Sequence, residues 1–175
     1  MSAPVPNERV FVALGANLGE PLRQLRGAIA ALGQLRGFDV RAVSRFHRTA
    51  PVGGPAGQPD YWNAVLEGAS ELEPEPLLAA LLALEQRFGR VRLEPMGPRT
   101  LDLDLLQFGT RRMASDSLVL PHPRMEDRLF VLEPLAELAP ELVLMDSGQS
   151  IRARIAELRQ THSAQPGARS ARDGW

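Results

Sequence analysis

The sequence predicts an α+β fold, in which helices pack against an antiparallel β-sheet. Two observations lead to this prediction: strand-like segments alternate with helix-like segments along the chain, and 175 residues suit one domain with a sizeable core. We expect a single domain over residues 1–160. Residues 161–175, rich in Ser, Gly, Ala and Arg, are expected to form a loosely ordered tail.

The predicted elements follow the order β-α-β-β-α-β. They are a strand over 10–14, a helix over 21–35, a strand over 38–46, a strand beginning near Tyr61, a helix over 74–88 and a strand through Thr100–Leu106. Pro21 at the start of the first helix and Gly37 beyond its end are typical helix boundaries. Apolar residues of the second helix repeat on one face, which is typical of a helix packed on a core.

This order predicts the split βαβ, or ferredoxin-like, arrangement, in which helices cover one face of an antiparallel sheet. The C-terminal third is expected to cover the other face. It contains a short strand over 118–120, a helical or irregular segment over 129–138 and a last helix over 151–158. The expected whole is a βαββαβ core extended C-terminally into a three-layer αβα domain.

Two carboxylates form the first candidate site. Asp102 and Asp104 alternate with leucines, and because strand side chains alternate between faces, both aspartates share one face. Their backbones lie about 7 Å apart. Mg²⁺ typically takes one or two carboxylates and completes its shell with water and substrate phosphates. Taken alone, the pattern is more typical of an ordinary half-exposed strand, so its neighbours decide the interpretation.

Arginines surround the aspartate pair in the sequence. They are Arg90, Arg92, Arg99, Arg111, Arg112, Arg124 and Arg128. Guanidinium groups match phosphate oxygens well, although internal salt bridges on a solvated face are an alternative. Seven arginines exceed what two aspartates need for neutralisation, which favours an anionic, metal-chelated ligand.

The composition excludes several classes of protein. The chain has no cysteine, which excludes disulfides, zinc–cysteine sites, iron–sulfur clusters and thiol nucleophiles. All 20 basic residues are arginine, so no lysine can bind phosphate or form a Schiff base. A net charge of −1 argues against a nucleic-acid coat, and neither a membrane span nor a signal peptide is visible. We expect a cytoplasmic monomer that binds neither nucleic acid nor membrane.

Two loops and several isolated side chains are further candidates. The loops over 51–59 and 89–98 are candidate lids, with ordinary surface connections as the alternative. Tyr61, Asn63 and Phe130 suit a pocket for a planar heterocycle, although most aromatic residues belong to the core. Asn63 is the hardest to assign to a core, because a buried amide needs hydrogen-bond partners. His122 lies between two prolines and can donate to a phosphate, although a lone histidine is more often structural.

Five sequence blocks resemble a known enzyme family. They are Val12–Gly19, Arg48–Asn63, Gly89–Arg92, Met96–Leu106 and Pro121–Leu132. In order and spacing they resemble the 6-hydroxymethyl-7,8-dihydropterin pyrophosphokinases of folate biosynthesis, over residues 10–156. The resemblance implies an enzyme that transfers the terminal pyrophosphoryl group of ATP to the hydroxymethyl group of a reduced pterin and releases AMP. Its expected partners are therefore two small molecules, ATP and the pterin.

The resemblance also implies roles for individual residues. It makes Asp102 and Asp104 the ligands of two Mg²⁺ ions and, with Arg90 and Arg92, the catalytic set. The implied ATP-binding residues are Glu85, Arg90, Arg92, Arg99, Leu105, His122 and Arg128. The implied pterin-binding residues are Thr49, Ala50, Val52, Tyr61, Asn63 and Phe130.

The chain departs from the family's pattern at four positions, namely Ala50, Pro95, Met96 and Pro123. These departures are expected to affect lid behaviour and substrate affinity rather than the chemistry. Two other functions remain as alternatives. A metal-dependent nucleotidyltransferase would release pyrophosphate in place of AMP. A ferredoxin-like RNA-binding module would need an aromatic-rich strand and a basic surface.

Overall fold

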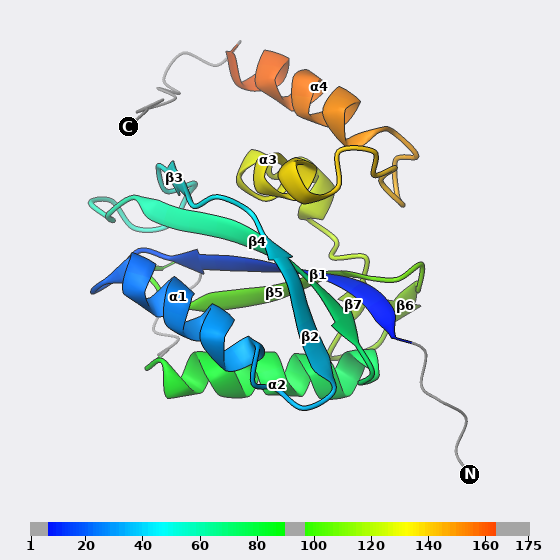
Figure 1. The fold of residues 1–175 in the computed structure, drawn as a ribbon. Coiled ribbons are helices and arrows are strands. Elements are labelled where there is room, and N and C mark those ends of the chain that lie inside the picture. The colour runs from blue at the N-terminus through cyan, green and yellow to red at the C-terminus, as the bar shows by residue number, and fades with distance from the viewer. Residues whose placement is uncertain (1–6, 90–96, 164–175) are drawn as a thin grey trace.

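The structure of the protein is a computed structural model, which describes residues 7–89 and 97–163. Within these residues an antiparallel sheet has α-helices on both faces (Figure 1). The predicted residues Arg90, Arg92, Pro95 and Met96 lie outside the described residues, as does most of the expected tail, from 164 to 175.

The predicted helices and strands are present, with adjusted boundaries. In chain order the elements are β1 (Glu8–Ala16), α1 (Pro21–Leu32), β2 (Phe38–Val43), β3 (His47–Thr49), β4 (Tyr61–Ser70), α2 (Pro74–Arg87), β5 (Asp102–Phe108), β6 (Met113–Ala114), β7 (Val119–Leu120), the 3-10 turn η1 (Met125–Asp127), α3 (Leu129–Leu138) and α4 (Ile151–Ser163). The segment over 129–138 is a regular helix. The last helix continues to Ser163, beyond the expected domain boundary at 160, and β6 was not predicted.

One predicted strand, over 38–46, is divided at Ser44. The Ser44 backbone N–H donates to the Val65 carbonyl (2.9 Å), and the Ser44 hydroxyl accepts from the Val65 N–H (2.9 Å). A side chain therefore takes the place of a backbone acceptor, and the regular ladder stops. The chain resumes pairing as β3, a separate strand of three residues.

The sheet has the strand order β2-β4-β1-β5, and β3 also pairs with β4. Each pairing is antiparallel, so the predicted α+β fold with an antiparallel sheet is confirmed. The long strands β1 and β4 lie at the centre. β4 pairs with β2 along its second half and with β3 at its start, where Tyr61 lies opposite Thr49 and Asn63 opposite His47.

Both faces of the sheet are buried, because alternate side chains of each central strand enter different hydrophobic clusters. Val10, Val12 and Leu14 pack with leucines of α1 and α2. Phe11 and Val65 pack with α3 and α4 on the other face. The second cluster fixes α3 across the sheet, where the helix contacts β4 on one side and α4 on the other (Figure 1). In the described residues, no helix has the length and hydropathy needed to cross a membrane.

A β-bulge interrupts β5 after the aspartates. Val12 lies opposite Leu105 and Phe11 opposite Gln107, so Leu106 is an extra residue on β5. Leu105 and Phe108 pack on the α1–α2 side, whereas Leu106 enters the cluster beneath α3. Before the bulge, the regular alternation places Asp102 and Asp104 on one face, as predicted from the sequence, and this face is the α3 side.

Gly68 of β4 is a position where the sheet tolerates no side chain. A Cβ there would lie 2.3 Å from Cζ of the buried Phe38 ring. We expect Gly68→Ala to lower the free energy of unfolding by about 1–3 kcal/mol, the usual cost of overpacking a core. Chemical denaturation measures this loss. Gly33→Ala, whose Cβ would make ordinary contacts of 3.5 Å or more, is the control; equal stability of both variants would contradict the prediction.

Candidate active site

A cavity of about 390 Å³ opens between the end of β1, the starts of β4 and β5, and the start of α3. Its floor follows from the sequence of β1, where the side chains facing α3 decrease in size from Phe11 through Ala13 to Gly15. Ala13 and Gly15 line the cavity, opposite Asp104 and Asp102 respectively. Small residues at this end of β1 therefore leave space above the aspartates.

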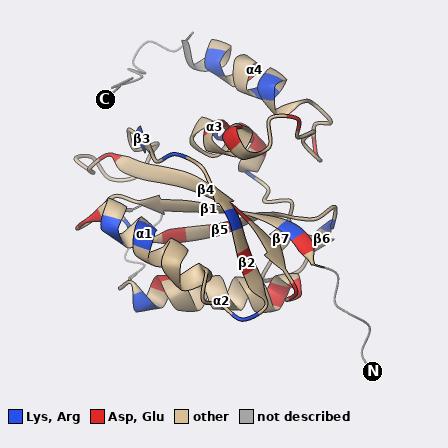
Figure 2. Ribbon diagram, in the orientation of Figure 1, with Lys and Arg blue, Asp and Glu red and all other residues tan. Residues whose placement is uncertain are grey.

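The cavity brings together most of the predicted site residues. Its lining includes Thr49, Ala50, Val52, Tyr61, Asn63, Arg99, Asp102, Asp104, Arg124, Arg128 and Phe130. Both aspartates and every residue expected to bind the pterin are in this set. β5 is an edge strand of the sheet, and Figure 2 shows acidic residues at its beginning.

The two aspartates differ in their surroundings. Asp102 forms an ion pair with Arg99. Oδ2 of Asp104 lies 3.9 Å from both His122 Nε2 and Arg128 Nη1. Burial and the neighbouring Asp102 charge raise the pKa of Asp104, in spite of the nearby Arg128 and His122 side chains. A cation beside the pair would offset this repulsion.

The donor set fits Mg²⁺ better than a metal held by protein ligands alone. The described residues contain no group of three or more His, Asp or Glu side chains arranged around one metal position. Two oxygen ligands on a rigid strand suit a hard cation that takes its remaining ligands from water and substrate phosphates. Asp102 and Asp104 are therefore the residues that would hold it.

A backbone hydrogen bond at the bulge places His122. Its N–H donates to the Leu106 carbonyl (2.8 Å), which attaches the segment after β7 to β5. Nδ1 of His122 accepts a hydrogen bond from the Arg124 N–H (3.2 Å), so in the neutral ring the proton is on Nε2, which faces Asp104. Burial lowers the pKa of His122, which favours this neutral donor form.

The segment over η1 that leads to Arg128 is anchored from the C-terminal side. The buried Glu126 carboxylate accepts from the N–H groups of Asp146 (2.9 Å) and Ser147 (3.1 Å). Arg154 of α4 donates to the Glu126 carbonyl (2.8 Å). These bonds fix the chain just before α3 and so orient Arg128.

Arg128 links the charged and aromatic parts of the cavity. Its guanidinium lies 5.5 Å from the centroid of the Phe130 ring and 3.9 Å from Asp104. Burial and the neighbouring Arg124 lower the pKa of Arg128 from its ordinary value, but arginine remains charged at neutral pH. The site thus has a partly buried positive charge between the aspartates and the aromatic wall.

The other wall of the cavity comes from β3 and β4. Asn63 is only 7% exposed, and its Nδ2 donates to the Thr49 hydroxyl (2.7 Å). A Cβ on Gly15 would lie 3.2 Å from Asn63 Oδ1, so the glycine leaves room for this amide. The Tyr61 hydroxyl donates to the Gly97 carbonyl (3.0 Å), and burial raises its pKa. The buried amide thus has a partner, as the sequence required.

Sequence reasoning gave Asn17 no role, although it lay in a recognised block. This residue is 3% exposed and joins three segments. Its Oδ1 accepts from the Arg99 N–H (2.8 Å), its own N–H donates to the Arg99 carbonyl (3.0 Å), and its Nδ2 donates to the Pro59 carbonyl (3.1 Å). The available sequence signal was an amide side chain directly after a strand, since such a side chain needs hydrogen-bond partners if it is buried.

Some predicted residues lie beside the cavity rather than among its described lining. Glu85 of α2 is 2% exposed and accepts a hydrogen bond from the Leu103 N–H (2.7 Å). Leu105 is buried on the α1–α2 side. Of the seven arginines that flank the aspartates in the sequence, Arg111 pairs with Glu73 and Glu8, and Arg112 pairs with Asp146. These two make the surface salt bridges that were the alternative.

Comparisons with known proteins agree with this geometry. The family model of 7,8-dihydro-6-hydroxymethylpterin-pyrophosphokinase (HPPK) matches residues 11–140. The 2-amino-4-hydroxy-6-hydroxymethyldihydropteridine pyrophosphokinase of Synechocystis sp. is 49% identical over 147 residues, which cover 84% of this chain and 74% of the relative. The enzyme of the same name from Haemophilus influenzae is 44% identical over 137 residues, covering 78% and 85%.

Solved structures show the same fold at low sequence identity. Wild-type HPPK-DHPS of Plasmodium falciparum with pteroate matches with a TM-score of 0.72 and 11% identity. The match covers 94% of this chain and 45% of that longer chain. The family model covers most of the chain, and the two bacterial relatives are 49% and 44% identical to it over most of its length. The chain therefore belongs to the 7,8-dihydro-6-hydroxymethylpterin-pyrophosphokinase family.

Proposed function

We propose that the protein uses this cavity to transfer the terminal pyrophosphoryl group of ATP to 6-hydroxymethyl-7,8-dihydropterin. The products are AMP and the pterin diphosphate, which serves folate biosynthesis. Curated relatives named for this enzyme are 44–49% identical over most of the chain. The observation that carries the assignment to this cavity is that Asp102 and Asp104 line it together with arginines and with aromatic and amide side chains.

The reaction asks for positioning and charge neutralisation rather than a side-chain nucleophile. The hydroxymethyl oxygen forms a bond to the β-phosphorus of ATP and releases its proton to water. The bond from that phosphorus to the oxygen bridging the α- and β-phosphates breaks, and AMP leaves with this oxygen. Mg²⁺, when bound, neutralises triphosphate oxygens and assists deprotonation of the attacking hydroxyl. We assign it to Asp102 and Asp104, with two ions as the expected number.

Arg99, His122 and Arg128 form the ATP side of the proposal. The Nε2–H group of His122 points toward the aspartates, where it would donate a hydrogen bond to a phosphate oxygen. Arg99 and Arg128 supply two guanidinium forks. Arg90 and Arg92, which follow α2 in the sequence, remain predicted catalytic residues. Glu85 and Leu105 remain predicted near the nucleoside, and the hydrogen bond from Leu103 to Glu85 supports a role in fixing β5.

Thr49, Ala50, Val52, Tyr61, Asn63 and Phe130 form the pterin side of the proposal. Tyr61 and Phe130 come from different elements and offer faces on which a flat ring can stack. The Asn63 amide, fixed by Thr49, is placed to hydrogen-bond to the edge of the heterocycle. A cavity that is apolar with a few fixed polar groups is typical of a site for a small planar substrate.

The strand order β2-β4-β1-β5 and the two helix layers support a ferredoxin-like βαββαβ core within a three-layer domain over residues 1–160. A cytoplasmic monomer remains our expectation for the working enzyme. Size-exclusion chromatography with light scattering tests the monomer, since a dimer would elute at twice the 19.1 kDa mass.

Product analysis tests the proposed reaction. The protein is mixed with ATP and Mg²⁺, with and without 6-hydroxymethyl-7,8-dihydropterin, and the nucleotides are separated. We expect AMP that depends on the pterin, with neither ADP nor free pyrophosphate. ADP would indicate an ordinary kinase, and pyrophosphate would indicate nucleotidyl transfer. Either product, or no turnover, would overturn the proposal.

Asn17→Ala is expected to lower kcat/KM by about 100-fold, since small displacements of catalytic groups cost about this much. The substitution removes the side-chain bonds that hold the Arg99 N–H and the Pro59 carbonyl. Steady-state AMP formation measures the effect. Asn7→Ala, at the exposed start of the described chain, is the matched control. Wild-type kinetics for Asn17→Ala would show that the backbone bonds alone fix Arg99.

A further inference from the structure

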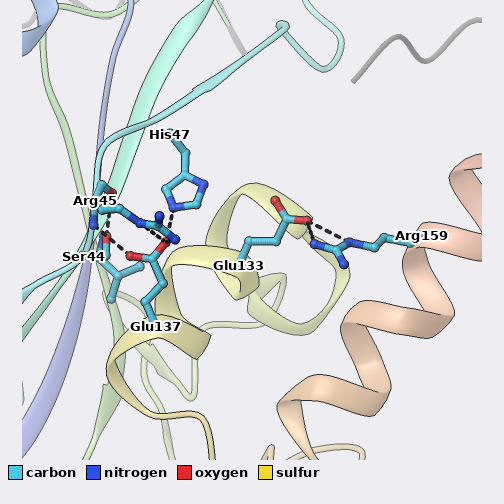
Figure 3. Close-up of polar contacts among 7 residues, drawn as sticks. Ser44, Arg45, His47, Glu133, Glu137 and Arg159 are labelled. Carbon is cyan, nitrogen blue, oxygen red and sulfur yellow. Dashed lines mark hydrogen bonds and ion pairs between the residues drawn. The ribbon is translucent and has the colours of Figure 1, made fainter. Parts of the chain in front are cut away.

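A polar cluster outside the cavity connects its two walls. Glu137 lies on α3 and faces the segment that runs from Ser44 into β3 (Figure 3). Its Oε2 accepts from the Arg45 N–H (2.9 Å), and its Oε1 contacts Arg45 Nη2 (3.1 Å) and His47 Nε2 (2.7 Å). Both carboxylate oxygens of one helix residue are therefore bonded to one short stretch of the sheet edge.

This stretch of the sheet bears one wall of the cavity. His47 and Thr49 lie two residues apart on β3, so they share the face toward α3. Thr49 accepts the hydrogen bond from Asn63 that orients the amide. β3 has three residues and meets β4 through a correspondingly short ladder, so its backbone bonds give limited resistance to displacement.

The helix that carries Glu137 bears the opposite wall. Phe130 lies two helical turns before Glu137, about 10 Å along α3 at the standard rise per residue. Partial burial alone would raise the pKa of Glu137, but hydrogen bonds from Arg45 and His47 outweigh it and lower the pKa, so the carboxylate is charged at neutral pH. A charged acceptor makes stronger hydrogen bonds than a neutral one.

We propose that Glu137 is a positioning residue for the pterin. It fixes β3 against α3 and so sets the spacing between the bonded pair of Thr49 and Asn63 on one side and Phe130 on the other. The inference rests on the proposed assignment of the pterin to these residues. Glu137 touches neither substrate in this assignment and acts through β3. The ATP side, held by Asn17, Leu106 and the Glu126 network, is anchored independently.

Steady-state kinetics with each substrate varied separately tests the proposal. For Glu137→Ala we expect the KM for the pterin to rise about tenfold or more, the KM for ATP to stay near the wild-type value, and kcat to change less than the pterin KM. Glu137→Gln keeps one oxygen acceptor but loses the charge, so its pterin KM should lie between those of wild type and Glu137→Ala. Direct binding of the pterin, measured with α,β-methylene-ATP and Mg²⁺ present, should follow the same order.

Glu133→Gln is the matched control. Glu133 lies one turn earlier on α3 and pairs with Arg159 of α4 (2.7 Å), not with β3 (Figure 3). Its substitution removes a comparable ion pair and should leave the pterin KM unchanged. Equal effects of Glu133→Gln and Glu137→Gln, or equal changes in the KM of both substrates, would overturn the positioning role.

His47→Leu gives a second test from the other side of the contact, should Glu137→Ala fold poorly by circular dichroism. It removes one donor to Glu137 and should also raise the pterin KM selectively. In the double variant the two effects should not add, because both remove the same link. If the wild-type enzyme formed no pterin-dependent AMP, the proposed function would be refuted. An active wild type with unchanged pterin KM in both variants would refute only the role of Glu137.

Discussion

Replacing Asp104 with alanine is expected to lower kcat by about a thousandfold or more. Preorganised charges that act on a developing transition state are worth this much individually, and the residue belongs to the proposed Mg²⁺ site. Asp102→Ala should have a similar effect, since the two carboxylates share one face of β5. AMP formation at saturating ATP, pterin and Mg²⁺ measures both losses.

Removal of the Asp104 charge should leave the fold intact, which separates chemistry from stability. Burial and the Asp102 charge raise the pKa of Asp104 in the folded protein. An acid whose pKa is raised by folding destabilises the folded state at pH values above that pKa, and the penalty disappears as the group is protonated. Asp104→Asn should therefore unfold no more easily than wild type at pH 7 without Mg²⁺.

The control for the aspartates is Asp60→Ala. Asp60 precedes β4 and pairs with Arg48 at the surface (3.0 Å), where ion pairs contribute little. Its loss should leave kcat near the wild-type value. The metal assignment would be contradicted if Asp102→Ala or Asp104→Ala, with folding verified by circular dichroism, were nearly as active as Asp60→Ala.

Arg128→Ala is expected to lower kcat/KM for ATP by about 100- to 1,000-fold, the range observed for loss of one charge-stabilising donor. The substitution removes the partly buried positive charge beside Asp104 and its contact with the Phe130 ring. Arg128→Lys keeps the charge but loses the planar fork, so it should recover only part of the activity. ATP titrations at saturating pterin measure both variants.

Arg111→Ala serves as the comparison for Arg128. Its guanidinium pairs with Glu8 and Glu73 on the surface, so only a small effect on kcat/KM is expected. If Arg111→Ala and Arg128→Ala lost the same activity, net charge rather than the position of Arg128 would explain the loss. Full recovery by Arg128→Lys would show that a point charge is sufficient there.

Local pattern was enough to predict much of this fold. Alternation placed Asp102 and Asp104 on one face, and prolines and glycines marked the starts and ends of helices. The order of elements then predicted the antiparallel sheet. These features depend on residues close in sequence, where side-chain periodicity and backbone preferences act directly.

The features that were missed depend on contacts between distant residues. Ser44 divides a predicted strand because its hydroxyl bonds to Val65. Asn17 acquires its importance only when Arg99 and Pro59 come beside it. The arginine count near the aspartates likewise could not distinguish Arg128, which enters the cavity, from Arg111, which pairs on the surface. Such roles become visible once the sheet brings the segments together.

The bulge in β5 gives Leu106 no partner of its own on β1, while its carbonyl holds the segment that bears His122. If Leu106 were deleted, Leu105, Gln107 and Phe108 would keep their partners on β1, and the strand would simply become regular. The deletion would remove the carbonyl that receives the His122 N–H. A shortened chain would thus keep the register between β1 and β5 but lose the buried Leu106 side chain. The segment that bears His122 would lose its attachment to β5. Family members that differ in length at this point should therefore differ in how they present that histidine, even where its sequence motif is unchanged.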